Sequence, residues 1–329
     1  MRLALLAAGL LLLAHSAAGQ SPVPPGATLE LLWNEGEFTE GVAVASDGTV
    51  YFSDIAIAGK NPGRIMKFVP ATRQTTVYVS DSGQSNGLFF NTQGKLLAAC
   101  GANHGHRALC EVRPDGSMQV LAGTYQGKRF NAPNDLVVHP RGWVYFSDPR
   151  YVGSEPLELD HQSVYRYDPS GQVHRATTDI TKPNGLMLSP DARTLYVAET
   201  DNGATGVEPP GTPPRAPRYT LNAFAIQADG SLGPKRVLAD FGTDGGIDGM
   251  TTDLQGNIYA AFRQPARKGI LVFNREGKEI AHIPTEPLPT NCTFGVGPEA
   301  HVLYITAGSG LYRIGLKTRG YHPELSSAP

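Results

Sequence analysis

Residues 133–148 read PNDLVVHPRGWVYFSD, a polar amide followed by an apolar run, a turn and a second apolar run. The same plan recurs in five other places, and each copy opens with a side chain that carries an oxygen atom. The six opening residues, which stand 46, 48, 50, 64 and 43 positions apart, are Glu40, Asn86, Asn134, Asn184, Asp248 and Asn291. A repeat of about 40 to 50 residues with several short strands is typical of a β-propeller blade. The sequence therefore predicts an all-β fold, a six-bladed β-propeller.

Each repeat continues with further strands after its second apolar run. A third run, alternating and rich in Val, Tyr, Ile and Phe, follows in every repeat, as at 163–167 and 269–273, and this composition is typical of half-buried strands. A fourth run follows in five repeats, but after Arg313 only a polar tail remains. An unassigned strand-like run at 28–33 precedes the first repeat. We expect this N-terminal strand to complete the last blade, because doing so closes the ring and covers a sheet edge.

The N-terminus has the features of an export signal. Met1 and Arg2 precede an apolar run at 3–14 and small residues at 17–19, which is the order found in secretory signal peptides. A membrane anchor is the alternative, but the run is shorter than the roughly 20 residues that span a bilayer. The sequence predicts a signal peptide at 1–19, a linker at 20–27, the propeller at 28–318 and a C-terminal tail at 319–329. The mature protein is expected to be exported, either periplasmic or secreted.

The charge pattern limits the kinds of molecule that the protein is expected to bind. The formal net charge is −2, and the Lys and Arg residues form no basic stripe, so nucleic acid is not an expected partner. We expect a monomer that acts on a small molecule and does not bind a membrane after signal cleavage.

Cys100 and Cys110 flank a short turn and could form a disulfide in an oxidising compartment. Cys292 would then be a free, buried thiol.

The opening residues of the repeats predict a metal site. If each repeat begins with the innermost strand, these residues surround the central channel on one common face. Six carboxylate and amide oxygens around an axis match a hard divalent cation, and the flexible coordination of Ca²⁺ suits them better than the strict octahedron of Mg²⁺. Mg²⁺, Mn²⁺ and Zn²⁺ remain alternatives, although no His or Cys opens a repeat as zinc would favour. The competing interpretation is that the Asn-Gly pairs only mark turns.

Five stretches of the chain together resemble one known family. They are EG at 40–41, KRFNAPND at 128–135, PNGL at 183–186, DGM at 248–250 and LYITAG at 303–308. The chain resembles the SMP-30/gluconolactonase/LRE-like propellers, which include gluconolactonases, other sugar lactonases and regucalcin, over about residues 31–314. In that family a Glu, two Asn and an Asp hold one divalent cation, so the resemblance implies the ligands Glu40, Asn134, Asn184 and Asp248. Asn86 and Asn291 would be neighbours that hold water or substrate.

The resemblance also implies a reaction, the hydrolysis of a sugar lactone to the aldonic acid. The cation would polarise the lactone carbonyl while a carboxylate accepts a proton from the attacking water. Asp248 is the candidate base, and the alternative is that it only holds the metal. A Gly-x-Ser-x-Gly pattern at 83–87 would require a strand-to-helix elbow. Because another strand follows it, the pattern does not indicate a serine nucleophile.

Loops that follow the second strand of a repeat are expected near the entrance of the channel. On this basis His104 could bind a sugar hydroxyl, whereas His106 is expected to be a solvated loop residue. Arg129 and Asn131 precede a predicted ligand and could hydrogen-bond substrate oxygens. The alternative for His104 is likewise a solvated loop position.

Two further segments are expected near the entrance. Arg150 and Tyr151 follow the second strand of the third repeat, and the Pro-rich insertion at 201–218 could form a partial lid or an inert spacer. Two other functions stay open, because a fold alone does not fix function. One is a propeller that binds a small molecule or protein without catalysis, and the other is a phosphotriesterase-like calcium hydrolase.

Overall fold

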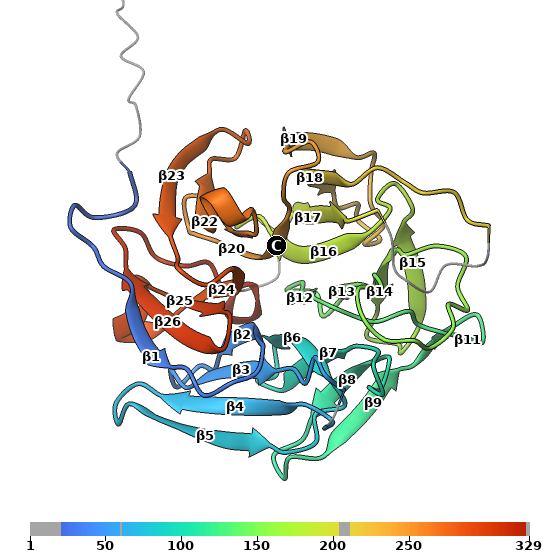
Figure 1. The fold of residues 1–329 in the computed structure, drawn as a ribbon, viewed down its shortest axis with the longest axis horizontal. Coiled ribbons are helices and arrows are strands. Elements are labelled where there is room, and N and C mark those ends of the chain that lie inside the picture. Colours follow the sequence, from blue (N-terminus) through green and yellow to red (C-terminus); the bar gives the residue numbers. More distant parts are fainter. Residues whose placement is uncertain (1–20, 60, 204–210, 327–329) are drawn as a thin grey trace, which may run out of the picture.

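The computed structural model describes residues 21–59, 61–203 and 211–326, whose sheets form a ring (Figure 1). Within this described part of the chain, six four-stranded antiparallel sheets lie around a central axis. The predicted six-bladed β-propeller is therefore confirmed. In each of the first five blades the strands follow the chain from the axis outward, so that the first strand of the blade is the innermost.

The strands of the first three blades are β2 (Thr39–Val44), β3 (Val50–Asp54), β4 (Arg64–Val69) and β5 (Gln74–Val79); β6 (Ser85–Phe90), β7 (Leu96–Cys100), β8 (Ala108–Val112) and β9 (Met118–Ala122); β12 (Leu136–Val138), β13 (Val144–Ser147), β14 (Val164–Tyr167) and β15 (Val173–Thr177). The strands of the other three are β16 (Pro183–Leu188), β17 (Thr194–Asp201), β18 (Arg218–Ala225) and β19 (Arg236–Asp240); β20 (Ile247–Thr252), β21 (Ile258–Phe262), β22 (Gly269–Phe273) and β23 (Glu279–Pro284); β24 (Pro289–Phe294), β25 (Val302–Ala307), β26 (Gly310–Gly315) and β1 (Glu30–Trp33).

The N-terminal strand closes the ring, as predicted. Strand β1 pairs antiparallel with β26 and becomes the outer strand of the sixth blade. Glu30 stands opposite Arg313 in this register, and the two side chains form an ion pair with Nε and Oε2 2.7 Å apart. The same Glu30 carboxylate pairs with Arg73 at 2.6 Å. The two ends of the propeller are thus joined by backbone pairing, and the edge of β26 is covered.

Burial decreases from the axis to the rim of each blade. All residues of β2, β16 and β20 are buried, whereas β5 and β19 are mostly exposed or half-buried. An innermost strand packs against the neighbouring blades on both of its faces, so its residues need not alternate between apolar and polar. Close packing of this kind fixes side chains in one conformation. Glu40, Asn184 and Asp248, which are considered below, lie on these rigid inner strands.

The beginning of the inner strand is irregular in five blades. Its pairing with the second strand slips across the segments Glu40/Val42, Ser85/Leu88, Pro183/Leu186, Ile247/Met250 and Pro289/Asn291. A β-bulge of this kind re-aims a side chain next to a site. Asn86 and Asn184 lie inside strands at these bulges, so the interpretation of their Asn-Gly pairs as hairpin turns is wrong.

The glycine that follows an opening residue has a packing role. A Cβ atom on Gly185 would lie 2.2 Å from the backbone oxygen of Asp248, and one on Gly41 would lie 2.0 Å from the backbone oxygen of Asn86. Both oxygens belong to the inner strand of the next blade. The inner strands therefore approach one another too closely around the axis to admit any side chain at these positions.

Short elements between the blades were not predicted. Strands β10 (Thr124–Tyr125) and β11 (Lys128–Arg129) form a two-stranded hairpin, and there are 3₁₀ turns η1 (Pro265–Arg267), η2 (Gly297–Glu299) and η3 (Pro323–Leu325). Such elements are two or three residues long and carry no periodicity that a sequence pattern could reveal.

The first part of the C-terminal tail packs against the propeller. The Tyr321 amide donates a hydrogen bond to the carbonyl oxygen of Thr252 at 2.9 Å, and the Tyr321 ring is buried. The His322 ring lies between the Glu324 carboxylate, at 3.0 Å, and the carbonyl oxygen of Gly295, at 3.1 Å. Because Thr252 ends β20 and Asp248 lies near its start, the tail occupies the end of the channel opposite the opening residues.

Other predictions fall partly or wholly outside the described residues. The predicted signal peptide at 1–19 and the central part of the insertion, 204–210, lie there. Strand pairing in the fourth blade extends to Asp201 opposite Arg218, so the first and last residues of the predicted insertion belong to strands. None of the helices among the described residues has the length and apolar character that crossing a membrane requires.

Candidate active site

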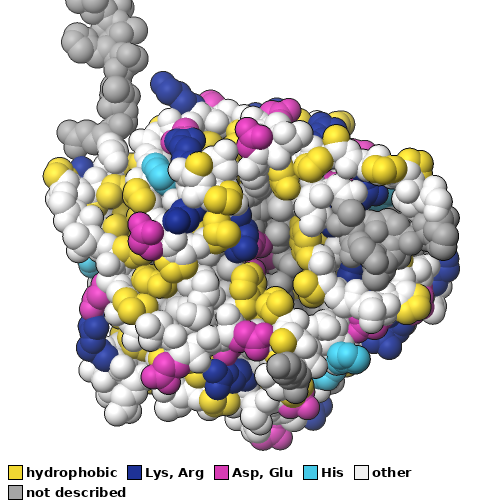
Figure 2. Space-filling view, viewed as in Figure 1, with side chains coloured by type: hydrophobic (Ala, Val, Ile, Leu, Met, Phe, Trp, Pro, Cys, Tyr) yellow, Lys and Arg dark blue, Asp and Glu magenta, His cyan; other side chains and the backbone are white. Residues whose placement is uncertain are grey.

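The opening residues converge on one cavity at the axis of the ring. The cavity has a volume of about 490 Å³, and five of the six opening residues line it: Glu40, Asn86, Asn134, Asn184 and Asp248. In the view along the axis the surface is hollowed near its centre, with apolar side chains around the hollow (Figure 2). The sixth, Asn291, lines a much smaller space of about 20 Å³ together with Asp135 and mostly apolar residues. Its Oδ1 accepts a hydrogen bond from the Cys292 amide at 2.8 Å.

The oxygens of this cavity fit a cation. Oδ1 of Asn184 is buried and has no hydrogen-bond partner, although buried polar atoms in proteins are nearly always paired. Glu40 and Asp248 place two buried carboxylates in the same cavity, 3% and 7% exposed. Like charges in a buried site are unfavourable unless an opposite charge compensates them. The unpaired amide oxygen and the two carboxylates are what an oxygen-coordinated divalent cation requires.

Burial and mutual repulsion act on the acidic groups at the axis. Burial, followed by the nearby Asp248 charge, raises the pKa of Glu40 well above its ordinary value. Burial also raises the pKa of Asp248, while the Arg263 guanidinium opposes this shift. Asp135 lies immediately after Asn134, and burial raises its pKa to about 7 even though its carboxylate accepts amide hydrogens from Leu136 at 2.9 Å and Leu186 at 3.0 Å. Asp135 thus ties the third blade to the fourth beneath the cavity.

Arg263 is a cavity residue that the sequence interpretation missed. Its Nη1 lies 3.2 Å from Oδ2 of Asp248 and also donates a hydrogen bond to the carbonyl oxygen of Pro289 at 3.1 Å. The guanidinium lies over the Phe38 ring, with its carbon 5.6 Å from the ring centroid. Arg263 directly follows the second strand of its blade, β21. The expectation that such loops face the entrance could have identified it, had the rule been applied to every repeat.

Tyr151 reaches the cavity from the third blade, as expected. Its hydroxyl donates a hydrogen bond to the carbonyl oxygen of Thr200 at 2.9 Å, and the Lys182 ammonium lies 4.7 Å from its ring centroid. Burial, followed by the Asp248 charge, raises the pKa of Tyr151 well above its ordinary value. Arg150 is buried instead, and its guanidinium donates to the carbonyl oxygen of Asn131 at 2.7 Å. The expected entrance position of Arg150 is therefore wrong, because its cation is used to hold the loop.

Much of the remaining cavity wall is apolar. The side chains of Phe38, Ile55, Ile57, Val152 and Tyr219 contribute to it. Polar side chains such as Asn103, Asn202 and Asp244 complete the lining. Asn202 lies at the start of the insertion and Tyr219 directly follows its end, so the chain reaches the cavity where it enters and leaves the insertion. A ligand here meets oxygens at the axis and hydrocarbon surface along the wall.

The other sequence-predicted substrate residues do not line this cavity. His104 is exposed, and its amide donates to the Glu155 carboxylate at 2.7 Å. Arg129 is exposed and donates to the backbone oxygen of His106 at 2.7 Å. Asn131 is buried behind the cavity, where its amide groups bind Asp148 at 2.9 and 3.2 Å. These three residues hold loops, and substrate contacts have to come from residues that the cavity contains.

Ser85, the serine of the Gly-x-Ser-x-Gly pattern, has no nucleophile geometry. It begins strand β6, is buried, and its hydroxyl lies 2.9 Å from the hydroxyl of Ser53. A nucleophile elbow would place the serine between a strand and a helix. The sequence interpretation against a serine nucleophile is consistent with this arrangement.

The fold and the axial cavity define a six-bladed propeller with an oxygen-lined site. The profile of the family described as SMP-30/Gluconolactonase/LRE-like region matches residues 38–309, and the chain belongs to this family. A gluconolactonase of Zymomonas mobilis is 30% identical over 317 residues, which cover 89% of this chain and 82% of the relative.

Solved structures show the same relationship. The structure of a gluconolactonase from Xanthomonas campestris matches with a TM-score of 0.72 and 32% identity, covering 88% of this chain and 90% of that one. A calcium-binding regucalcin from Agrobacterium tumefaciens matches with a TM-score of 0.68 over 92% of this chain and 97% of that one, at 20% identity. The latter likeness is one of fold.

Proposed function

We propose that this protein is a lactone hydrolase that opens a sugar lactone to the corresponding hydroxy acid, with a divalent cation held at the axis. The family relationship, which includes gluconolactonases, supports the reaction. The observation that carries the site is the unpaired buried Oδ1 of Asn184 beside the carboxylates of Glu40 and Asp248 in one cavity. Asn134 lines the same cavity and is the fourth proposed ligand.

The donor set favours Ca²⁺ as the cation. The four proposed ligands offer only carboxylate and amide oxygens, and three of them, Glu40, Asn184 and Asp248, lie on the inner strands of three different blades. Such oxygens suit Ca²⁺, whereas zinc prefers nitrogen and sulfur. When bound, the cation would polarise the lactone carbonyl and stabilise negative charge on its oxygen.

Asp248 is the proposed proton acceptor. A water molecule adds to the carbonyl carbon and gives one proton to the Asp248 carboxylate, the bond from that carbon to the ring oxygen breaks, and the ring oxygen takes up a proton. The hydroxy acid that results contains all atoms of the lactone and of one water. Arg263, 3.2 Å from Asp248, favours the ionised carboxylate that this step needs.

The side chains of the cavity wall can orient the lactone. Phe38, Ile55 and Val152 can pack against the hydrocarbon face of a lactone ring, while Asn86 and Asn103 offer amides for its hydroxyl groups. A pocket that combines an apolar wall with a few placed polar groups is the usual arrangement for small-molecule recognition. Thus the site has one end for the reacting carbonyl and another for the substituents.

The test is turnover of glucono-δ-lactone by the purified protein, followed as acid release above the spontaneous rate. The chelator-treated protein should be inactive, and Ca²⁺ should restore activity. Hydrolysis that is unchanged after removal of the cation would contradict the cation's role. Cation binding with no hydrolysis of any lactone would instead identify a non-catalytic binding propeller.

A further inference from the structure

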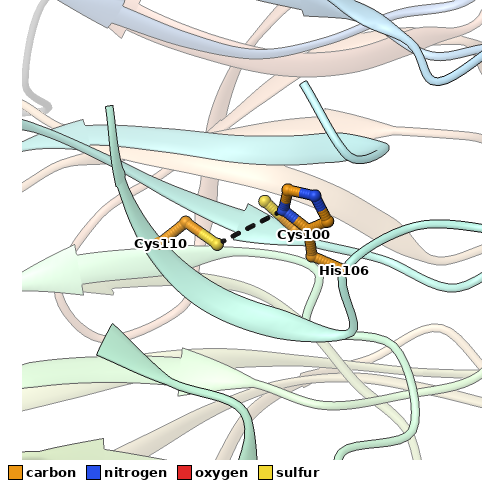
Figure 3. A group of neighbouring side chains, drawn as sticks. All are labelled: Cys100, His106 and Cys110. Atoms are coloured by element: carbon orange, nitrogen blue, oxygen red, sulfur yellow. Dashed lines mark hydrogen bonds between the residues drawn. The ribbon is translucent and has the colours of Figure 1, made fainter. Parts of the chain in front are cut away.

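A second group of metal-ligating atoms lies outside the axial cavity. It consists of Cys100 at the end of β7, Cys110 in β8 and His106 in the loop that joins them (Figure 3). Their ligating atoms all lie within 4.8 Å of one another, and Sγ of Cys110 is 3.8 Å from Nδ1 of His106. Both cysteines are fully buried, and both are free thiols. The two side chains belong to the apolar cluster between the first and second blades.

Strand register decides how the two thiols can be joined. Cys100 stands opposite Ala108, and Cys110 stands opposite Ala98, so the cysteines are diagonal neighbours on the same face of the sheet. Diagonal neighbours have Cα atoms about 7–8 Å apart, whereas a disulfide needs about 4.4–6.8 Å. A disulfide between them would require the backbone to move. A metal ion bridges a wider gap, because two thiolates on one zinc ion are roughly 3.8 Å apart.

The His106 ring is held in place toward the thiols. The His106 amide donates to the carbonyl oxygen of Gly83 at 3.0 Å, and its own carbonyl oxygen accepts from Arg129 at 2.7 Å. The imidazole packs directly on Gly83, where an added Cβ atom would lie 2.4 Å from Nδ1. Only glycine leaves room for the ring. The sequence predicted that His106 is a solvated loop residue, and this prediction is wrong. Its ring is held in place beside the two thiols, where it could bind a metal ion.

We propose that Cys100, His106 and Cys110 form a zinc site. Two thiolates and one imidazole are a known zinc donor set, with water as a fourth ligand, and the half-buried His106 side leaves a path for that water. Tetrahedral bonds of about 2.0–2.3 Å place ligand atoms roughly 3.5–3.8 Å apart, close to the 3.8 Å already present between Cys110 and His106. The donors differ in kind from the oxygens of the axial cavity.

The cluster also lies next to the axial cavity. The zinc would also act on the neighbouring cavity. Gly101, Ala102 and Asn103 line that cavity and belong to the same loop as His106, so a zinc ion would fasten one wall of the axial site.

Cobalt titration of the reduced full chain tests the proposal. Co²⁺ replaces Zn²⁺ in thiolate sites and gives an intense thiolate-to-metal absorption that oxygen ligands do not give, so binding in the axial cavity does not contribute to the signal. One equivalent of Co²⁺ should produce the absorption, and Zn²⁺ should abolish it. Cys110→Ser should lose it, whereas Cys292→Ser, which removes another buried free thiol, should retain it. His106→Asn should weaken the absorption without affecting the fold.

The outcomes separate this site from the proposed lactonase. Absence of thiolate absorption in the reduced, folded wild-type chain would overturn the zinc site and would leave the calcium-dependent activity untouched. Equal absorption in wild type and Cys110→Ser would also overturn it. Conversely, a chain that shows the absorption but hydrolyses no lactone would keep the zinc site and refute the proposed function.

Discussion

Nη1 of Arg263 lies 3.2 Å from Oδ2 of Asp248, and the two residues come from the second-strand loop and the inner strand of the same blade. The Asp248 carboxylate, which is the proposed base, therefore lies beside the positively charged Arg263 guanidinium. Burial raises the pKa of the Asp248 carboxyl, and the guanidinium counteracts that rise. The balance between the two sets the pH range in which Asp248 can accept a proton.

Arg263→Met should move the acid limb of the activity profile to higher pH. Without the guanidinium, the largest influence that opposes burial is lost, so the pKa of Asp248 rises further and the ionised base is reached only at higher pH. Activity should fall more at about pH 6 than at about pH 9. Arg267→Met is the control, because Arg267 pairs with Glu279 at the surface. A profile of Arg263→Met that is uniformly lowered at every pH would contradict the proposed electrostatic role.

Asn184→Ala should weaken cation binding with little loss of stability in the cation-free protein. The Oδ1 atom that it removes has no hydrogen-bond partner to lose, and the cation-free protein loses only the interactions of the Asn184 amide with Asp248 and Tyr151. Calorimetric titration with Ca²⁺ should show affinity lower by at least about tenfold. Asn291→Ala is the matched comparison, since Asn291 opens an equivalent repeat but already bonds the Cys292 amide. Its Ca²⁺ affinity should hardly change; equal losses in the two variants would refute the ligand assignment.

Gly185→Ala should damage the ring at the axis. The new Cβ atom would lie 2.2 Å from the backbone oxygen of Asp248, and backbone cannot yield as a flexible side chain can. We expect a fall of several degrees in melting temperature, as is usual for about 1–3 kcal/mol of overpacking, together with weaker Ca²⁺ binding. Gly315→Ala is the control, because nothing lies within 4 Å of its Cβ position. A melting temperature equal to that of wild type would show that the inner strands can separate.

His322→Gln should destabilise the protein more in acid than in base. Burial disfavours the charged ring, but the Glu324 carboxylate outweighs it, so the pKa of His322 is raised. A raised histidine pKa contributes stability below the ordinary value, and that contribution is lost as pH rises through the folded-state pKa. Thermal melts should differ from wild type more at about pH 5.5 than at about pH 8.5. His301→Gln, at an exposed position, is the matched control for the substitution.

The repeat made the fold and most of the axial cavity predictable. Glu40, Asn86, Asn184 and Asp248 are each the second residue of an inner strand, so the repeat spacing located them. The closing strand β1 was predictable because one blade lacked its fourth strand. In contrast, the direction of a side chain within a loop depends on contacts from distant segments, such as those of Asn131 with Asp148. For that reason the loop predictions were the least accurate.

For the cysteine cluster, too, the sequence could predict proximity but not the detailed arrangement of the side chains. The sequence indicated that Cys100 and Cys110 are near each other, because a short turn joins their strands. It could not show that they are diagonal and not directly opposed, since register follows from the pairing of β7 with β8. Nor could it show that Gly83, 23 positions before His106, makes room for the imidazole.

The central claim, that Asp248 holds the cation and accepts the proton, is tested most directly by the turnover of Asp248→Asn at saturating Ca²⁺. The amide keeps an oxygen for the cation but cannot serve as the base, so Ca²⁺ should still bind while turnover of glucono-δ-lactone falls by about 100-fold or more. Asp244→Asn, in the exposed wall of the same cavity, should stay active. Turnover of Asp248→Asn equal to that of wild type under these conditions would contradict the account.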